Sequence, residues 1–373
     1  MDIVIAKADL ASALARVQGI VEKKNTVPIL SSVLLEAQGA ELSVSATDLE
    51  LFLRSRYPVQ VAKAGVATAP AKKLFEIVRE LPDGEVRLIA GDKGWLRIEM
   101  GRARFKVMSL PKDDFPALPL AQEGEKIEFA PALLIEAIEK TGFAMSHDQT
   151  RQALNGILLE VAPISGDEAD LRLIATDGHR LAFIQRRCRA AVAGNRGVIV
   201  PRKAITEVRK LLGEEAAGAS VELSFQENRL FFRIGASLLV TRLVDGQFPD
   251  YHQVIPTGGT RIAIVEREGF YRAVRRVSTV TADRVNLLRF GFSEGRVSVT
   301  AVNPEIGEAT EDAEAEFTGG DIELGMNARY ILDVFSVIGQ EKVVIEMNEA
   351  LSPALVRPLG DDGYRCVVMP MRL

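Results

Sequence analysis

Ala175-Thr-Asp-Gly-His-Arg-Leu-Ala-Phe183 is the stretch that decides the fold, because shorter versions of it occur twice more in the chain. Ala46-Thr-Asp-Leu-Glu50 lies 129 residues before it, and Ala301-Val-Asn-Pro-Glu305 lies 126 residues after it. Each copy ends a run of alternating apolar residues, which predicts a β-strand with one buried face leading into a turn. The chain therefore carries three copies of one structural element.

A helix is expected about 25 residues after each copy, over residues 70–81, 201–212 and 327–338. The first two begin at a proline and the third at an asparagine. Proline is tolerated in the first helical turn, where its missing N–H would have no partner, and asparagine caps a helix start well. Three matched landmarks at one spacing predict a threefold repeat of a domain-sized unit.

Each repeat is predicted to hold a further helix near its start, from about residue 8, over 131–143 and over 267–280. Phe115-Pro116 and Phe248-Pro249 follow equivalent strands and mark the passage from one repeat to the next. We therefore expect an α+β fold of three tandem domains, each with two helices packed on antiparallel sheets. The expected domains are residues 1–124, 125–257 and 258–373.

The composition is that of a soluble globular protein, with 47% hydrophobic and 26% charged residues. No apolar run reaches the ~18 residues of a membrane span, and the first residues lack the basic and apolar regions of a signal peptide. A cytoplasmic location is therefore expected. Cys188 and Cys366 lack the spacing of a metal site, so both are expected to be buried free thiols.

Catalysis is the least favoured of the functions considered. Asp177 and His179 could transfer protons, but the other two copies of the stretch lack histidine, and no Gly-x-Ser-x-Gly motif is present. Gly360-Asp-Asp-Gly363 is predicted to be a hairpin turn and not a pair of catalytic acids. The histidines lack the spacing of metal ligands, and no glycine-rich phosphate-binding motif occurs, so no cofactor or metal is expected.

The net charge of −5 is unevenly distributed. Residues 201–212 and 267–280 each carry +3, whereas residues 305–323 hold eight acidic side chains and no basic one. On the helices over 70–81 and 201–212, the basic residues fall mostly opposite the apolar ones. No base-reading motif accompanies these faces, so they favour contact with phosphates irrespective of nucleic-acid sequence.

Together, these motifs resemble the bacterial sliding clamp family, the beta subunit of DNA polymerase III, over the whole chain. The resemblance rests on the three repeats and on specific stretches: Ala175–Leu181, Val200-Pro-Arg-Lys203, Leu243-Val-Asp-Gly-Gln-Phe-Pro-Asp-Tyr251 and Val368-Met-Pro-Met-Arg-Leu373. It implies a non-enzymatic processivity factor, a head-to-tail homodimeric ring that encircles duplex DNA. The alternative is a repeat-built scaffold that binds peptides without encircling DNA.

The resemblance also implies a pocket that binds short hydrophobic peptides of the replicative polymerase, the clamp loader, and repair and ligation proteins. Gln253 and Val285 depart from the basic and aromatic residues expected there. The implied pocket residues are Leu154, Thr176, Gly178, His179, Arg180, Leu181, Pro249, Val254, Asn327, Tyr330, Leu351, Val367, Val368, Met369, Pro370, Met371 and Arg372.

Two further surfaces are expected. Thr279 and Val280 match the family's apolar subunit contact, and we suggest that Glu308, Glu311 and Asp312 face Arg102 or Arg104 of the neighbouring subunit. The residues expected to face DNA are Lys72, Lys73, Arg79, Arg151, Arg202, Lys203, Arg209, Lys210, Arg272, Arg275 and Arg276.

Overall fold

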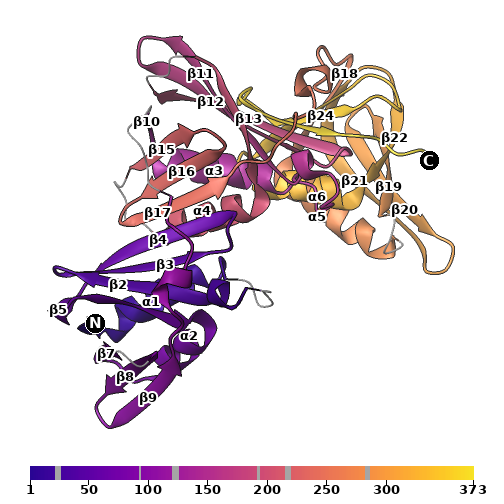
Figure 1. Ribbon diagram of the computed structural model, residues 1–373. Helices are drawn as coiled ribbons and strands as arrows, with labels where there is room; N and C mark the ends of the chain where they lie inside the picture. The colour runs from indigo at the N-terminus through magenta and orange to yellow at the C-terminus, as the bar shows by residue number, and fades with distance from the viewer. Residues whose placement is uncertain (22–26, 92–93, 120–125, 191–193, 215–219, 282–285) are drawn as a thin grey trace. The chain divides into compact units, whose positions relative to one another are not determined.

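A computed structural model describes residues 1–21, 27–91, 94–119, 126–190, 194–214, 220–281 and 286–373 (Figure 1). The chain forms two compact units, one of Met1–Pro131 with Lys203–Leu243 and the other of Ala132–Arg202 with Val244–Leu373. Residues of the central sequence repeat thus belong to both units. The expected boundary near residue 124 and the position of Val285 lie outside the described residues.

The first unit contains two antiparallel sheets, with strand orders β5-β1-β7-β8-β9 and β10-β15-β16-β17-β4-β3-β2-β6. Helices α1 (Lys7–Val17) and α2 (Ala71–Glu80) pack against each other, and α4 (Arg202–Glu214) follows later in the chain. The strands are β1 (Asp2–Ala6), β2 (Ser32–Gln38), β3 (Glu41–Thr47), β4 (Leu51–Pro58), β5 (Gln60–Lys63), β6 (Gly65–Pro70), β7 (Glu85–Gly91), β8 (Trp95–Met100), β9 (Ala103–Met108), β10 (Lys126–Phe129), β15 (Val221–Gln226), β16 (Arg229–Ile234) and β17 (Ser237–Arg242).

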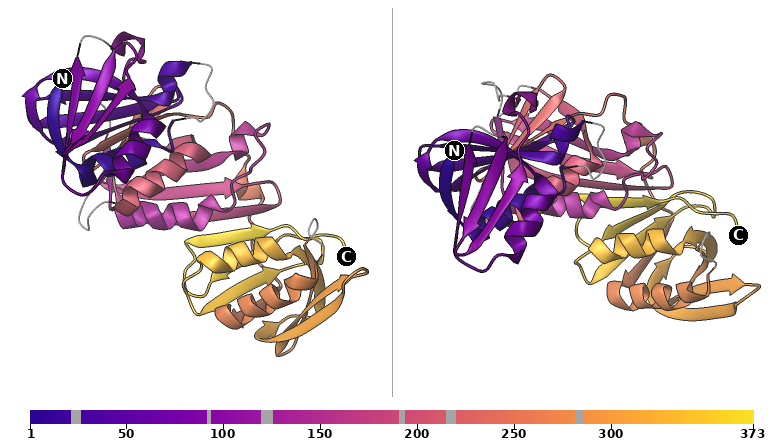
Figure 2. Two further views of the ribbon diagram at one scale, coloured as in Figure 1. Left: turned by 90° about the horizontal axis from the view of Figure 1, so that it is seen from below. Right: turned by 60° about the horizontal axis from the view of Figure 1, so that its bottom comes forward.

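The second unit contains one run of paired strands, in the order β14-β11-β12-β13-β25-β24-β23-β18-β21-β20-β19-β22. Its helices are α3 (Pro131–Gly142), α5 (Arg267–Val277) and α6 (Ala328–Val337), and Figure 2 shows α5 and α6 side by side in orange and yellow. The strands are β11 (Gly156–Ser165), β12 (Glu168–Thr176), β13 (Arg180–Arg189), β14 (Arg196–Pro201), β18 (Arg261–Glu266), β19 (Leu287–Ser293), β20 (Arg296–Asn303), β21 (Gly307–Thr318), β22 (Ile322–Asn327), β23 (Lys342–Met347), β24 (Ala354–Pro358) and β25 (Tyr364–Val368).

The predicted helices are confirmed: α3 and α5 begin at the expected residues, and the other helices begin within one residue of the expected start. Pro70 and Pro201 are the last residues of β6 and β14 and not the first residues of helices, because their fixed φ suits the extended backbone as well. Asn327 caps α6 as predicted: its Oδ1 accepts hydrogen bonds from the N–H groups of Arg329 at 2.9 Å and Tyr330 at 3.4 Å. The Gly360–Gly363 turn connects β24 to β25 as a hairpin, also as predicted.

The first two copies of the repeated stretch fold into the same hydrogen-bonded turn. Asp48 Oδ1 accepts from the N–H groups of Glu50 at 3.0 Å and Leu51 at 2.6 Å. Asp177 Oδ1 accepts from the N–H groups two and three residues further on, at 2.9 and 3.0 Å. In the third copy, Asn303 Oδ1 accepts from Glu305 N–H at 3.0 Å. The Asp or Asn side chain at the end of the strand thus accepts a hydrogen bond within the turn each time.

Leu49→Gly is expected to stabilise the protein by up to about 1 kcal/mol, because Leu49 adopts a left-handed φ of 79° and its side chain is largely exposed. Gly178 occupies the equivalent position with a φ of 89°. Thermal unfolding would measure the gain, with Gly178→Ala as the counterpart that should destabilise. A lower melting temperature for Leu49→Gly would contradict this account of the turn.

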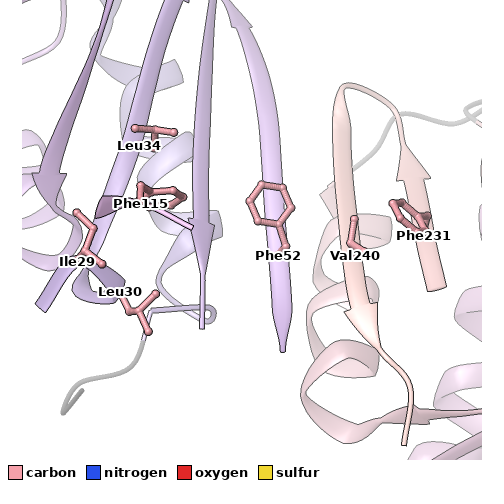
Figure 3. Close-up of a cluster of buried hydrophobic side chains, with 7 residues drawn as sticks. All are labelled: Ile29, Leu30, Leu34, Phe52, Phe115, Phe231 and Val240. Carbon is pink, nitrogen blue, oxygen red and sulfur yellow. The ribbon is translucent and has the colours of Figure 1, made fainter. Parts of the chain in front are cut away.

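Phe115, one of the two phenylalanines that mark a passage between repeats, is part of a buried apolar cluster in the first unit (Figure 3). Phe52 on β4 and Val240 on β17 are cross-strand partners in the same cluster. Ile29, Leu30, Leu34 and Phe231 complete it. The cluster therefore stabilises the pairing of strands from two sequence repeats within one sheet.

The prediction of two buried thiols is right for one cysteine. Cys366 is fully buried, its Sγ lies 3.1 Å from the Tyr364 hydroxyl, and burial raises its pKa to about 12. Cys188 is only half-buried, because it lies near the exposed end of β13. Both are free, and burial raises the pKa of Cys188 to about 11, so neither thiol ionises readily at neutral pH.

Candidate peptide-binding pocket

An apolar cavity of about 120 Å³ opens on one face of the β12–β13–β25 sheet. Thr176, Leu181 and Val367 supply its floor from neighbouring strands, where Leu181 is the cross-strand partner of both other residues. Segments before and after the sheet supply the walls. The full lining is Leu154, Thr176, Gly178, Arg180, Leu181, Phe248, Pro249, Tyr251, Val254, Val367 and Met369. Such a cavity suits an apolar side chain.

About half of the pocket residues implied by the resemblance line this cavity, and the others lie beside it or away from it. His179 stacks on Tyr330, with ring centroids 6.4 Å apart, and Leu351 is 62% exposed. Met371 instead forms a bridge to Gly325, donating its N–H to that carbonyl at 2.7 Å. The implied residues that do not line the cavity are His179, Asn327, Tyr330, Leu351, Val368, Pro370, Met371 and Arg372.

Phe248 and Tyr251 line the pocket without having been predicted there. Both lie in the stretch Leu243–Tyr251, and the aromatic residues of that stretch were the sequence feature that could have indicated their place in the pocket. Tyr251 is 5% exposed and packs with Leu181, Val367 and Phe183 in the cluster beneath the cavity. Its hydroxyl donates to Glu160 Oε2 at 2.8 Å, and burial, followed by this hydrogen bond, raises its pKa to about 12. The ring is therefore a fixed, uncharged wall.

Arg180 is the buried charge that organises the pocket edge. Its guanidinium donates to Asp177 Oδ2 at 3.0 Å, to Asp333 Oδ2 at 2.6 Å and to the Phe143 carbonyl at 2.7 Å. It also lies over the Tyr330 ring, 4.5 Å from the centroid. Two carboxylates and a carbonyl thus satisfy a side chain that is 8% exposed.

Both oxygens of the Asp177 carboxylate are engaged, Oδ1 by the N–H groups of the turn and Oδ2 by Arg180. The hydrogen bond between Asp177 and His179 uses the backbone N–H of His179 and not its imidazole. This geometry is that of a structural turn. Among the described residues, no group of three His, Cys, Asp or Glu side chains could hold a metal ion.

The basic residues expected to face DNA divide into exposed and structural ones. Lys72, Lys73 and Arg79 lie on the exposed face of α2, and Arg209 and Lys210 on that of α4, opposite the buried apolar residues. Arg151 and Arg275 are also exposed. Arg272 pairs with Glu268 at 2.6 Å on α5.

Arg202 and Lys203, predicted on the outer face of α4, are partly buried and make internal contacts. Arg202 donates to the carbonyls of Met145 at 2.6 Å and Ser146 at 2.9 Å, and its burial lowers its pKa. Lys203 Nζ lies 2.5 Å from Asp48 Oδ2 and donates to the Ile20 carbonyl at 3.1 Å. At the first turn of the helix both side chains reach back to neighbouring backbone and carboxylate oxygens, so they hold the fold.

Comparisons with known proteins cover the chain almost completely. Residues 1–119, 128–250 and 252–372 match the N-terminal, central and C-terminal domains of the DNA polymerase III beta subunit. The Beta sliding clamp of Caulobacter vibrioides is 40% identical over 375 residues, and the match covers all of both chains. The chain belongs to the DNA polymerase III beta subunit family.

Solved structures of other sliding clamps share this fold. A crystal structure of the beta sliding clamp of Caulobacter crescentus is 39% identical, with a TM-score of 0.95, over 100% of this chain and 99% of that one. The sliding clamp of Bartonella birtlesii bound to griselimycin is 38% identical, with a TM-score of 0.95, over 100% of both chains. The predicted family and the threefold clamp-domain fold are confirmed, and the family is not catalytic.

Most residues expected at the clamp's subunit contact lie on exposed surface, whereas Val280 and Glu311 are only partly exposed. Arg102, Arg104, Thr279 and Glu308 are exposed, and Val280 is half-buried in a short 3₁₀ helix, Ser278–Val280. Glu311 pairs with Arg276 of the same chain, Arg276 Nε lying 2.9 Å from Oε2, and this hydrogen bond lowers the pKa of Glu311. The suggested contact of Glu311 with a neighbouring subunit therefore competes with an internal ion pair.

A cluster around Arg186 joins α3 to the β24–β25 hairpin of the clamp. Arg186 Nη2 lies 2.8 Å from Glu136 Oε1 and 2.7 Å from Asp361 Oδ2, and Lys140 lies 2.9 Å from Glu136. Burial favours the neutral form of Glu136, but hydrogen bonds from Arg186 and Lys140 outweigh it and hold its pKa below the usual 4.5. The turn acid Asp361 thus has a structural role.

Glu136→Gln is expected to reduce the acid sensitivity of folding. Because the folded pKa lies below the unfolded value, the ion pair stabilises the protein above pH 4.5 and this stabilisation is lost as the pH falls through the folded pKa. Urea unfolding at a series of pH values from neutral to acidic would measure this, and the free energy of unfolding should fall less with pH in the variant than in the wild-type protein. Glu314→Gln, at an exposed position of β21, is the control. Equal acid sensitivity of Glu136→Gln and the wild-type protein would contradict the assignment.

None of the helices in the described ranges is long and apolar enough to cross a membrane.

Proposed function

We propose that the chain acts as a processivity clamp: a head-to-tail homodimeric ring that encircles duplex DNA and tethers the replicative polymerase. The observation that carries this function is the match of all three clamp domains, over residues 1–119, 128–250 and 252–372. A ring holds DNA by topology, so its individual phosphate contacts can be weak enough for sliding. We propose that it acts on DNA in the cytoplasm.

The exposed lysines and arginines of α2 and α4 are the proposed DNA-facing groups, since they can attract phosphates without reading bases. We assign Arg202 and Lys203 to the support of this surface, because their hydrogen bonds to carbonyl and carboxylate oxygens occupy them. The proposed domain limits remain residues 1–124, 125–257 and 258–373.

The apolar pocket is the proposed tether for short hydrophobic peptides of the polymerase, the clamp loader, and repair and ligation proteins. Its apolar lining, with Met369 at the mouth, can adapt to different side chains. Arg180 and the Asp177 turn keep the polar edge fixed. Binding then needs little rearrangement of the pocket.

For the subunit contact, we propose that Glu308 faces Arg102 or Arg104 of the neighbouring subunit, beside Thr279 and Val280. Glu308 is exposed, and among the residues that the structure describes it makes no ion pair. Glu308→Lys should weaken the dimer in sedimentation measurements, and Arg104→Glu should restore it. Unchanged dimer affinity would remove Glu308 from the contact.

Retention on nicked circular DNA tests the ring. The protein is loaded by the clamp loader with ATP, washed at high salt and followed before and after the circle is linearised. Loss only after linearisation is expected, because a topologically linked ring leaves by sliding off ends. Loss that depends on salt alone would indicate ordinary surface binding and favour the scaffold alternative.

A further inference from the structure

A second cavity, of about 470 Å³, adjoins the apolar pocket and has a different chemistry. We call it the polar groove and define it by Asp170, Arg172, Gln185, Arg187, Asp362 and Arg365. Tyr251 lines both cavities, so its ring is the wall between them.

The two cavities lie on one face of one sheet. Successive side chains of a strand alternate between faces, so Leu181, Phe183, Gln185 and Arg187 of β13 point the same way. Leu181 lines the apolar pocket, and the other three line the polar groove. Val367 and Arg365 repeat this order on β25. A bound segment can therefore run from one cavity to the other without leaving the face.

The polar groove contains more arginine side chains than carboxylates, so part of its positive charge is not neutralised within the groove. Arg172 is engaged by Gln185 Oε1 at 3.2 Å and Asp170 Oδ2 at 3.4 Å. The groove's other carboxylate, that of Asp362, pairs with Arg357 at 3.1 Å. The Arg187 side chain is exposed and, within the described part of the chain, makes no hydrogen bond or ion pair.

Arg365 adds a second cation on the adjacent strand. Its Nε donates to the Asp362 carbonyl at 3.0 Å, which fixes the guanidinium at the groove and leaves its charge without a carboxylate partner among the described residues. A carboxylate entering the groove would therefore meet two arginines. Arginine is well suited to this role because its planar donors match a carboxylate.

The spacing of the cavities sets the length of the ligand. Leu181 and Arg187 are six residues apart on β13, which corresponds to about 20 Å at ~3.4 Å per residue. An extended peptide rises by a similar amount per residue, so about four to six residues separate groups that reach the two cavities.

We propose that the polar groove binds an aspartate or glutamate side chain of the same peptide whose apolar residue fills the adjoining pocket, about four to six residues from that apolar anchor. The inference rests on the proposed peptide-binding function and adds a charge preference to it. Partners with an acidic flank would then be favoured over partners with a neutral one.

The test uses labelled synthetic peptides and the full chain. One peptide carries a Leu-Phe anchor, a Ser-Gly spacer of about four residues, set by the strand rise, and two glutamates. The matched peptide carries two glutamines, and both are made with the flank on either side of the anchor. Fluorescence anisotropy at low salt should give roughly twofold to fivefold tighter binding of the glutamate peptide in one orientation.

Arg187→Gln should reduce this preference, because among the described groove residues only Arg365 then remains without a carboxylate partner, and should leave the affinity for the glutamine peptide unchanged. Arg189→Gln, which removes an exposed charge on the same strand outside the groove, should retain the preference. Equal binding of glutamate and glutamine peptides to the wild-type protein would overturn the inference while leaving the apolar pocket intact. Failure of both peptides to bind would overturn the peptide-binding function and this inference with it.

Discussion

Arg180→Ala is expected to lower the free energy of unfolding by roughly 3 kcal/mol, because it breaks a buried ion pair by removing one partner. The substitution leaves Asp177, Asp333 and the Phe143 carbonyl without their shared donor. Asp333 keeps about a third of its side-chain exposure, which lets water compensate in part. Urea unfolding followed by circular dichroism would measure the change.

Arg329→Ala is the matched control, because Arg329 approaches the same carboxylate at 4.0 Å but is 73% exposed. It should change stability by no more than about 0.5 kcal/mol. Arg180→Lys should fall between the two, since lysine keeps the charge but lacks the planar set of donors. A loss below about 1 kcal/mol for Arg180→Ala would show that the charge network contributes little.

Met369→Asp is expected to weaken peptide binding at least about 100-fold, because it places a carboxylate against an apolar side chain that enters the pocket. Met369 lines the cavity and is 37% exposed, so the free protein can solvate the new charge and should keep its melting temperature. Titration of a labelled hydrophobic peptide would measure the affinity.

Ile164→Asp is the control for this variant. Ile164 lies on β11, is 44% exposed and does not line the pocket, so the same change in charge and polarity should leave peptide affinity unaltered. Wild-type affinity for Met369→Asp would place the peptide elsewhere on the clamp.

Periodicity was sufficient to predict the helices and the repeat, because both depend on local alternation and helix starts. The turn at Asp177 was recognisable for the same reason: its donors are two and three residues away. The family resemblance then brought most of the lining residues, including Leu181 and Val367, to one place.

The partners of individual charges could not be predicted this way. Lys203 pairs with Asp48, 155 residues earlier, and helical periodicity places Lys203 on an outer face without indicating that contact. Glu311 and Arg276 likewise belong to different elements. The place of Tyr251 between two cavities depends on how its segment lies on the sheet, which a local sequence motif does not indicate.

The pairing of β17 with β4, and of β13 with β25, joins consecutive sequence repeats into continuous sheets through backbone hydrogen bonds. At the first joint, Ser237–Thr241 pairs residue by residue with Ser55–Leu51, and Phe52 and Val240 are buried beside the seam. Separating neighbouring repeats of one chain would break the backbone hydrogen bonds between these strands and expose an apolar sheet edge to water.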